Sequence, residues 1–162
     1  FCKARQLVPK GEAMNYPRNN RMGALAPDQV AKDFYTYSVA FSSLLANTSQ
    51  TSSIQIDADS DFEIIKLTAQ AIISLSASPP TVDVQYINVV LTDTGSGRQL
   101  MNVATPLANL FGTAQLPFIL PKTKLLYARS VLAITLSNVN TAVNYDRVFL
   151  SFEGQKIFNT GA

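Results

Sequence analysis

The chain has 162 residues, of which 47% are hydrophobic and 15% are charged, and its net charge is +2. This length is enough for one domain with a hydrophobic core, and the composition excludes a disordered protein. The small net charge predicts no strong overall attraction to nucleic acid, so we expect no specific nucleic-acid partner. No apolar run reaches the roughly 18 residues of a membrane span, so we expect no membrane partner. The single cysteine excludes an intramolecular disulfide framework.

Residues 1–33 differ from the rest of the chain and predict an extended basic arm. Three prolines break any long helix, the stretch "NYPRNNRMG" is rich in turn-forming residues, and no apolar periodicity is present. Its basic residues outnumber the acidic Glu12, Asp28 and Asp33; they are Lys3, Arg5, Lys10, Arg18, Arg21 and Lys32. We expect this arm to bind a neighbouring protein subunit. The alternative is an arm that folds back on its own domain.

The candidate partner-binding residues of the arm are charged and apolar side chains. They are Arg5, Lys10, Arg18 and Arg21 as charged contacts, with Tyr16 and Met22 as apolar anchors. Where the arm ends, "APDQVAKDF" (26–34) is compatible with one short helical turn, because Pro27 suits the first position of a helix.

Residues 34–162 predict an all-β domain, a β-sandwich of jelly-roll-like type. The strand-like runs are, in chain order, "DFYTYSVAF", "SSIQIDADS", "DFEIIKLTAQAIISLS", "TVDVQYINVVLTDT", "LLYARSVLAITLSNV" and "DRVFLSFEGQKIF". β-branched and aromatic residues dominate these runs, and Pro, Gly, Asn, Asp and Ser separate them, as expected for a sandwich. Between them, "TGSGR" (94–98) predicts a hairpin turn. The stretch "MNVATPLANLFG" (101–112) predicts a short helix or an ordered loop, because Pro106 prevents a long helix.

The segment "IQIDADSDF" (54–62) raises the question of a metal site. Its three aspartates stand at every second position: Asp57, Asp59 and Asp61. An EF-hand loop that starts at Asp57 needs Gly at its sixth position and Glu at its twelfth, where this sequence has Phe62 and Thr68. Strand periodicity puts Ala58 on the apolar face with two isoleucines, and the aspartates on the other face. This pattern favours a solvated strand face that ends in a turn; a different cation site is the alternative.

The sequence offers little that points to catalysis. The chain has no histidine, which excludes Ser-His-Asp and Cys-His catalysis and zinc sites built on imidazole. The remaining candidate acids are scattered: Glu12, Glu63, Asp93, Asp146 and Glu153. A glycan hydrolase that pairs two of them across a cleft is a minor alternative. We therefore predict that the chain is not an enzyme and binds no cofactor.

Several tyrosines are candidates for binding a glycan by ring stacking. They are Tyr35, Tyr37, Tyr86, Tyr127 and Tyr145. Packing on strands, with the hydroxyl at the rim of the core, is the interpretation that we favour for them.

Four stretches between about residues 50 and 158 resemble small β-sandwich structural proteins of tailed-bacteriophage virions. They are "SIQIDADSDFEIIKLTAQA", "VVLTDTGSGRQLMN", "PLANLFGTAQLPFILPKTKLLYARSVLAITLSNV" and "VFLSFEGQKIF". The shared features are structural: the "DTGSGRQLM"-like segment, the proline-bounded "LPFILP" and the closing "FxGxKxF". The resemblance implies a head decoration or cement protein, or a neck, collar or tail-associated component. It supplies no catalytic residues, and the arm lies outside the similar part.

We therefore expect a non-enzymatic virion protein, assembled in the host cytoplasm, that decorates or cements the capsid. Its partners would be copies of itself, in a trimer or ring, and the major capsid protein or neck proteins. The arm would add a tethered second contact, which binds at a high effective concentration. The alternative from a different class is a glycan- or receptor-binding module on the virion surface.

Overall fold

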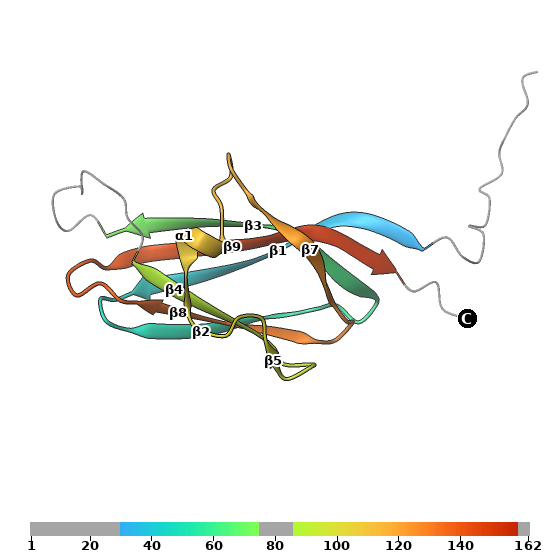
Figure 1. Ribbon diagram of the computed structural model, residues 1–162, viewed down its shortest axis with the longest axis horizontal. Coiled ribbons are helices and arrows are strands. Elements are labelled where there is room, and N and C mark those ends of the chain that lie inside the picture. Colours follow the sequence, from blue (N-terminus) through green and yellow to red (C-terminus); the bar gives the residue numbers. More distant parts are fainter. Residues whose placement is uncertain (1–29, 75–85, 159–162) are drawn as a thin grey trace, which may run out of the picture.

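The computed structural model describes residues 30–74 and 86–158, which form two antiparallel β-sheets (Figure 1). The strands are β1 (Ala31–Leu44), β2 (Ser49–Gln55), β3 (Ser60–Ile73), β4 (Ile87–Asp93), β5 (Arg98–Gln99), β6 (Thr105–Pro106), β7 (Phe118–Leu126), β8 (Val131–Asn138) and β9 (Tyr145–Phe158). A short helix, α1 (Leu107–Leu110), lies between β6 and β7.

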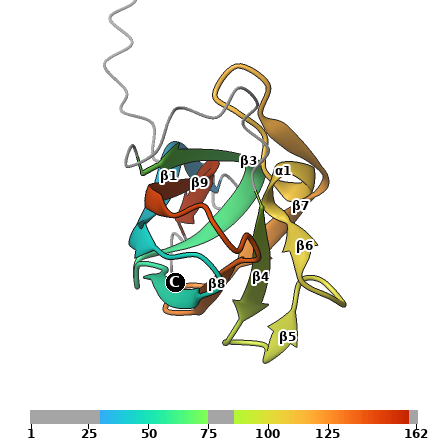
Figure 2. The same cartoon turned by 90° about the vertical axis from the view of Figure 1, so that its left-hand side faces the viewer.

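The order of the strands in the two sheets confirms the predicted β-sandwich. One sheet has four strands in the order β1-β9-β3-β7, and the other has the order β2-β8-β4-β5, with β6 paired to β4. The chain passes to the opposite sheet after β1, β2, β3, β6, β7 and β8, and only β4, β5 and β6 follow one another in the same sheet. This alternation, with the last strand beside the first, is the arrangement of a jelly roll. The two layers are seen end-on in Figure 2.

The core lies between the sheets because the strands alternate apolar and polar residues. In β8 and β9 every second side chain is buried: Leu132, Ile134, Leu136, Val148, Leu150 and Phe152. The alternate residues of β9, such as Phe149 and Ser151, are half-buried on the outer face of the first sheet. The two-residue period that predicted strands from the sequence is therefore the period of burial.

The structure corrects two local expectations. The first strand already includes Ala31, Lys32 and Asp33, so a helical turn over 26–34 is wrong for its last four residues, and β1 begins before the expected domain boundary at residue 34. Pairing with β9 explains this, because Ala31 lies opposite Phe158 at the end of the sheet. The residues before Val30, including the rest of the predicted arm, lie outside the described residues.

The second correction concerns the segment with three aspartates. The strand β2 ends at Gln55, and the chain turns at Ala58 and Asp59 before β3 begins. Ile56 is buried, but Ala58 is exposed rather than on the apolar face, because the alternation of the strand ends before it. The turn therefore comes earlier than the two-residue period predicted.

The turn and the short helix expected between residues 94 and 112 are confirmed. Residues 94–97 form the turn between β4 and β5, and Gly97 there has a φ of 64°, which glycine adopts at no steric cost. The helix α1 follows directly after Pro106. The expected strand over 81–94 is confirmed from Ile87 onward, and its start at 81–85 lies outside the described residues.

Close packing of β9 against β3 explains the glycine in "FEGQK". Gly154 lies opposite Ile64 of β3 and Tyr35 of β1 in the registers of the central strand. A Cβ atom added to Gly154 would lie 1.9 Å from the carbonyl oxygen of Glu63. Any larger residue at this position must push the two central strands apart.

Candidate functional site

The most connected polar cluster lies at the end of the sandwich where β9 ends and β3 begins. The amino group of Lys156, in β9, lies 2.5 Å from Oδ2 of Asp57, in the β2–β3 turn. The hydroxyl of Tyr37 donates a hydrogen bond of 3.1 Å to the same oxygen and accepts one of 3.1 Å from the Asp57 amide. Asp57 thus holds the turn against β1 and β9.

Lys156 is largely buried, with 9% of the residue exposed, and its amino group lies over an aromatic ring. Its nitrogen lies 4.1 Å from the centroid of the Tyr35 ring, a cation–π contact. The Tyr37 ring makes edge-to-face contacts, with centroid distances of 4.8 Å, to both Tyr35 and Phe62. The cluster of Tyr35, Tyr37, Asp57 and Lys156 is called the Lys156 cluster below.

The charges of the Lys156 cluster stabilise each other. The hydrogen bonds from Lys156 and then Tyr37 hold the pKa of Asp57 below its ordinary value of 3.8. The hydrogen bond to Asp57 raises the pKa of Lys156 above 10.5, although burial acts in the opposite direction. Burial raises the pKa of Tyr37. Both partners of the ion pair are therefore charged over the whole neutral range.

A second polar network ties the outer face of the four-stranded sheet together. Glu63 of β3 accepts hydrogen bonds of 2.6 Å from the Thr123 hydroxyl of β7 and from the Gln155 amide of β9. Lys32 of β1 lies 3.8 Å from the same carboxylate. The hydrogen bond from Thr123, followed by that from Gln155, lowers the pKa of Glu63. One carboxylate thus links all four strands of this sheet.

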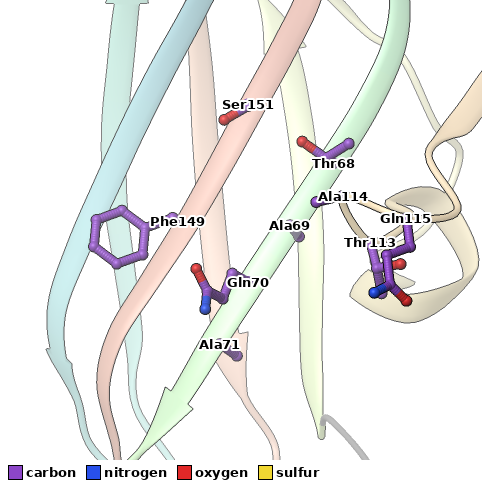
Figure 3. A pocket seen from close by; sticks show the side chains of 9 residues that line it. All are labelled: Thr68, Ala69, Gln70, Ala71, Thr113, Ala114, Gln115, Phe149 and Ser151. Atoms are coloured by element: carbon purple, nitrogen blue, oxygen red, sulfur yellow. The ribbon is translucent and has the colours of Figure 1, made fainter.

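A hollow of about 630 Å³ lies beside β3 on the same sheet (Figure 3). Its lining is uncharged: Thr68, Ala69, Gln70, Ala71, Thr113, Ala114, Gln115, Phe149 and Ser151. The loop before β7 forms one wall because Gly112 acts as a short partner of β3, donating to the Leu67 carbonyl and accepting from the Ala69 amide. Beyond Ala69, no other described strand continues this edge of β3. The lining can offer amide and hydroxyl hydrogen bonds but no charge.

A smaller hollow of about 370 Å³ lies between the β4–β5 turn and the β7–β8 loop. Its lining includes Tyr127, Arg129 and the buried carboxylate of Asp93. Asp93 accepts a 3.1 Å hydrogen bond from the Gly95 amide and lies 3.3 Å from the Lys124 amino group. Burial acts to raise the pKa of Asp93, but the hydrogen bonds from Ser96 and Lys124 outweigh it and the pKa is lowered. This carboxylate holds the turn and also connects the two sheets.

The three aspartates predicted as weak metal candidates have separate protein partners. Asp57 belongs to the Lys156 cluster, Asp59 accepts from the Ser60 hydroxyl at 3.0 Å, and Asp61 accepts from the Ala128 amide at 2.8 Å. Within residues 30–74 and 86–158, no group of three or more Cys, Asp or Glu residues is placed to hold a metal ion. The favoured interpretation of a solvated turn agrees with the exposure of Asp57 and Asp59.

The five predicted tyrosines differ in exposure, and Tyr86, directly before β4, is 50% exposed. Tyr145 is buried in the core and its hydroxyl accepts from the Tyr86 amide, as expected for strand packing. Tyr35 and Tyr37 lie in the Lys156 cluster, and Tyr127 is 68% exposed in the β7–β8 loop, at the same end of the sandwich as Asp57. The structure thus brings tyrosines and aspartates together at this end.

The predicted partner contacts of the arm lie outside the described residues. They are Arg5, Lys10, Tyr16, Arg18, Arg21 and Met22. Lys156 belongs to the motif "FxGxKxF", but no role for it was predicted from the sequence. A signal was present, because Lys156 follows Phe152 and Gly154 at the inward-facing positions of β9, where a charge needs a partner.

Comparisons with known proteins add no identification. No family model matches the chain, and no curated protein matches it. In the part of the chain that the structure describes, no helix is long and apolar enough to cross a membrane.

Proposed function

We propose that this chain is a non-enzymatic structural component of a tailed-bacteriophage virion, which decorates or cements the capsid. The observation that carries the proposal is the exposure of large apolar side chains in and beside "LPFILP", a stretch of the resemblance to virion proteins. Leu116 is 80% exposed and Ile119 is 67% exposed. Large apolar side chains that are exposed close together in one short segment suit a surface that another protein covers.

The surroundings of these residues suit a contact with another protein. They lie on the side of the sandwich where α1 and β7 are seen in Figure 2, at the free edge of the four-stranded sheet. The residues of β7 from Leu120 to Thr123 form a bulge. The pairs on either side of it are Lys66 with Ile119 and Ile64 with Lys124, so only one residue of β3 lies opposite these four. Pro121 removes an amide donor from this edge, which discourages unspecific strand pairing. A contact through side chains is therefore favoured here over backbone pairing with another strand.

Three carboxylates of the described region support a structural role. Asp57, Glu63 and Asp93 each have a lowered pKa, and each is held by hydrogen bonds from side chains of other strands. These acids stabilise the sandwich in their charged forms. A general acid would instead need a raised pKa.

The proposed partners are copies of the same chain, in a trimer or ring, and the major capsid protein or neck proteins. The basic arm would cross to a neighbouring subunit, and the site of action would be the virion after assembly in the host cytoplasm. A neck, collar or tail-associated position is the second form of the same proposal. Each interface would bury more than about 1,000 Å², the usual minimum for a specific contact.

The proposal is tested by measuring how many copies of the chain are incorporated into phage particles. Leu116→Ser with Ile119→Ser changes only exposed side chains, so the domain should fold as before. Particles assembled with this double variant should carry fewer copies than particles assembled with the wild-type chain, measured by quantitative mass spectrometry. A matched control is Lys122→Ser, which changes an exposed polar residue of the same strand. Equal copy numbers in all three samples would contradict the proposal.

A second candidate function has its own observation: exposed Tyr127 and Tyr35 lie with Asp57 and Asp59 at one end of the sandwich. Tyrosine faces beside carboxylates suit the stacking and hydrogen bonding of a sugar. This favours a glycan- or receptor-binding module on the virion surface as the alternative. A glycan array should then show binding that Tyr127→Ala removes, and an array without binding would exclude this function.

A further inference from the structure

The strand β1 forms one free edge of the four-stranded sheet, and no other described strand pairs with its outer side. It is 14 residues long, and its side chains from Lys32 to Tyr35 are exposed. Near the other end of β1, the Gln50 side-chain amide donates hydrogen bonds of 3.1 Å to the carbonyls of Ser42 and Ser43. The edge is thus closed by a side chain at this end and open from Phe34 to Ala40.

The hydrogen bonds of the sheet show which backbone groups of β1 face the open edge. The Ala69 amide and the Leu67 carbonyl of β3 bond to Gly112, on the side away from β9. Because backbone direction alternates along a strand, Thr68 and Gln70 face β9, and the even-numbered residues of β9 face β1. Their partners in β1 are odd-numbered, so the even-numbered residues of β1 point their backbone groups outward. The Ser42 carbonyl, bonded to Gln50, agrees with this, and the alternation is interrupted only at Ser43, which has a φ of 54° and no partner in β9.

The same even-numbered residues place their side chains on the outer face of the sheet, and one of them is a large apolar group. Phe34 is 74% exposed. Six residues further along the same row is Ala40, which is exposed and lies opposite Phe149 of β9. The ring of Phe149 extends from β9 toward β1 in Figure 3. Ala40 and Phe149 therefore offer a small and an aromatic side chain next to each other.

We propose that two copies of this chain pair through β1, antiparallel, with Phe34 of each copy opposite Ala40 of the other. The two-fold axis then passes through Tyr37, and Thr36 lies opposite Ser38 of the second copy. All four positions are even-numbered, so the free backbone donors and acceptors of the two edges meet as hydrogen-bonded pairs. The two sheets become one continuous sheet of eight strands. The inference rests on the proposed function, because it names one contact through which the subunit self-associates. This contact is two-fold and joins copies in pairs, so a trimer or ring needs a second contact between the pairs.

This register is favoured over its neighbours by the side chains that it brings together. It covers the exposed Phe34 ring with Ala40 and with the Phe149 ring beside it, whereas a shift by two residues puts Phe34 opposite Ser38 or Ser42. It also places Lys32 opposite Ser42 of the second copy, so that no like charges face each other. The second copy thus supplies both the missing strand and the missing apolar neighbour.

Engineered disulfides test the contact and its register together. The variants are Phe34→Cys and Ala40→Cys, each in full-length chain with Cys2→Ser, so that only one thiol remains per chain. In the proposed register these two positions face each other at about 5.5 Å between Cα atoms, a distance that a disulfide can span. In contrast, position 34 of one copy lies six residues along the strand from position 34 of the other copy, which is about 20 Å. The same holds for the two copies of position 40. The two variants are mixed under mild oxidation and analysed on non-reducing gels.

We expect covalent dimers in the mixture and few in either variant alone. Equal linkage in the single variants would overturn the register, and no linkage in the mixture, together with a monomeric wild-type chain by light scattering, would overturn the contact. Failure here is distinguishable from failure of the proposed function. If the chain enters particles but does not cross-link through β1, only the proposed contact is wrong. If the chain cross-links but is absent from particles, only the proposed virion role is wrong.

Discussion

Lys156 Nζ and Asp57 Oδ2 lie 2.5 Å apart and join the last strand of the fold to the turn between β2 and β3. This ion pair is asymmetric, because the side chain of Lys156 is 11% exposed and that of Asp57 is 49% exposed. Loss of the partner therefore costs more for the buried ammonium group of Lys156 than for the exposed carboxylate of Asp57. The pair closes the end of the sandwich at which the chain enters β1.

Replacement of Asp57 by Asn should destabilise the domain by about 1 kcal/mol at pH 7. The variant leaves a largely buried ammonium group without its carboxylate, and the exposure of Asp57 limits the loss. Urea denaturation measures the change in the free energy of unfolding. Asp59→Asn is the matched control, and we expect it to change stability by less than about 0.5 kcal/mol. Equal losses in both variants would show that the ion pair contributes nothing of its own.

The lowered pKa of Asp57 also predicts how stability depends on pH. A carboxyl group whose pKa is lower in the folded than in the unfolded state stabilises the fold above its ordinary value of 3.8. That contribution is lost as the pH falls through the lower pKa of the folded state. Thermal denaturation between pH 2 and 7, on the order of one scan per pH unit, should show a steeper acid loss for wild type than for Asp57→Asn. Parallel curves would contradict the assignment.

Glu63→Gln should weaken the outer face of the four-stranded sheet by about 1 kcal/mol. The carboxamide of the variant can still accept from Gln155 and donate to the Thr123 hydroxyl, but both hydrogen bonds lose their charge assistance and Lys32 loses its ion-pair partner. Urea denaturation should give a lower midpoint, and Thr123→Val, which removes a single hydrogen bond, should lower it less. A variant as stable as wild type would mean that solvent replaces these hydrogen bonds without cost.

Gly154→Ala should destabilise the domain by about 2–3 kcal/mol or prevent folding, because the new methyl group meets the backbone of β3. Gly97→Ala is the comparison, since space is free there and only the positive φ opposes alanine, at about 1 kcal/mol. Denaturant midpoints of the two variants should therefore rank Gly154→Ala as the less stable. The reverse order would mean that β9 and β3 can separate easily.

Reversal of two arm charges, Arg18→Glu with Arg21→Glu, should reduce incorporation into particles and leave the domain folded. Both residues precede β1 in the sequence, so no residue of the sandwich itself is changed. Circular dichroism checks the fold, and quantitative mass spectrometry of purified particles measures occupancy. Normal occupancy of the double variant would assign the arm another role.

The sequence predicted the sandwich because burial follows its two-residue period, as in β8 and β9. It did not predict the Lys156 cluster, because the partners Asp57 and Tyr37 are far from Lys156 in the chain and meet only through the strand order. The turn at Ala58 was misplaced for a related reason, since periodicity cannot tell where strand pairing ends. The free edge of β1 likewise follows from topology, and Phe34 reads in the sequence as one more strand residue.

The most direct test of the proposed virion role is to measure the number of copies of this chain in purified phage particles from the source of the sequence. Quantitative mass spectrometry, referenced to the major capsid protein, supplies that number. We predict a fixed copy number that is reproduced between preparations and withstands washing at high salt. A chain that stays in the lysate and is absent from the particles would contradict the proposed virion role.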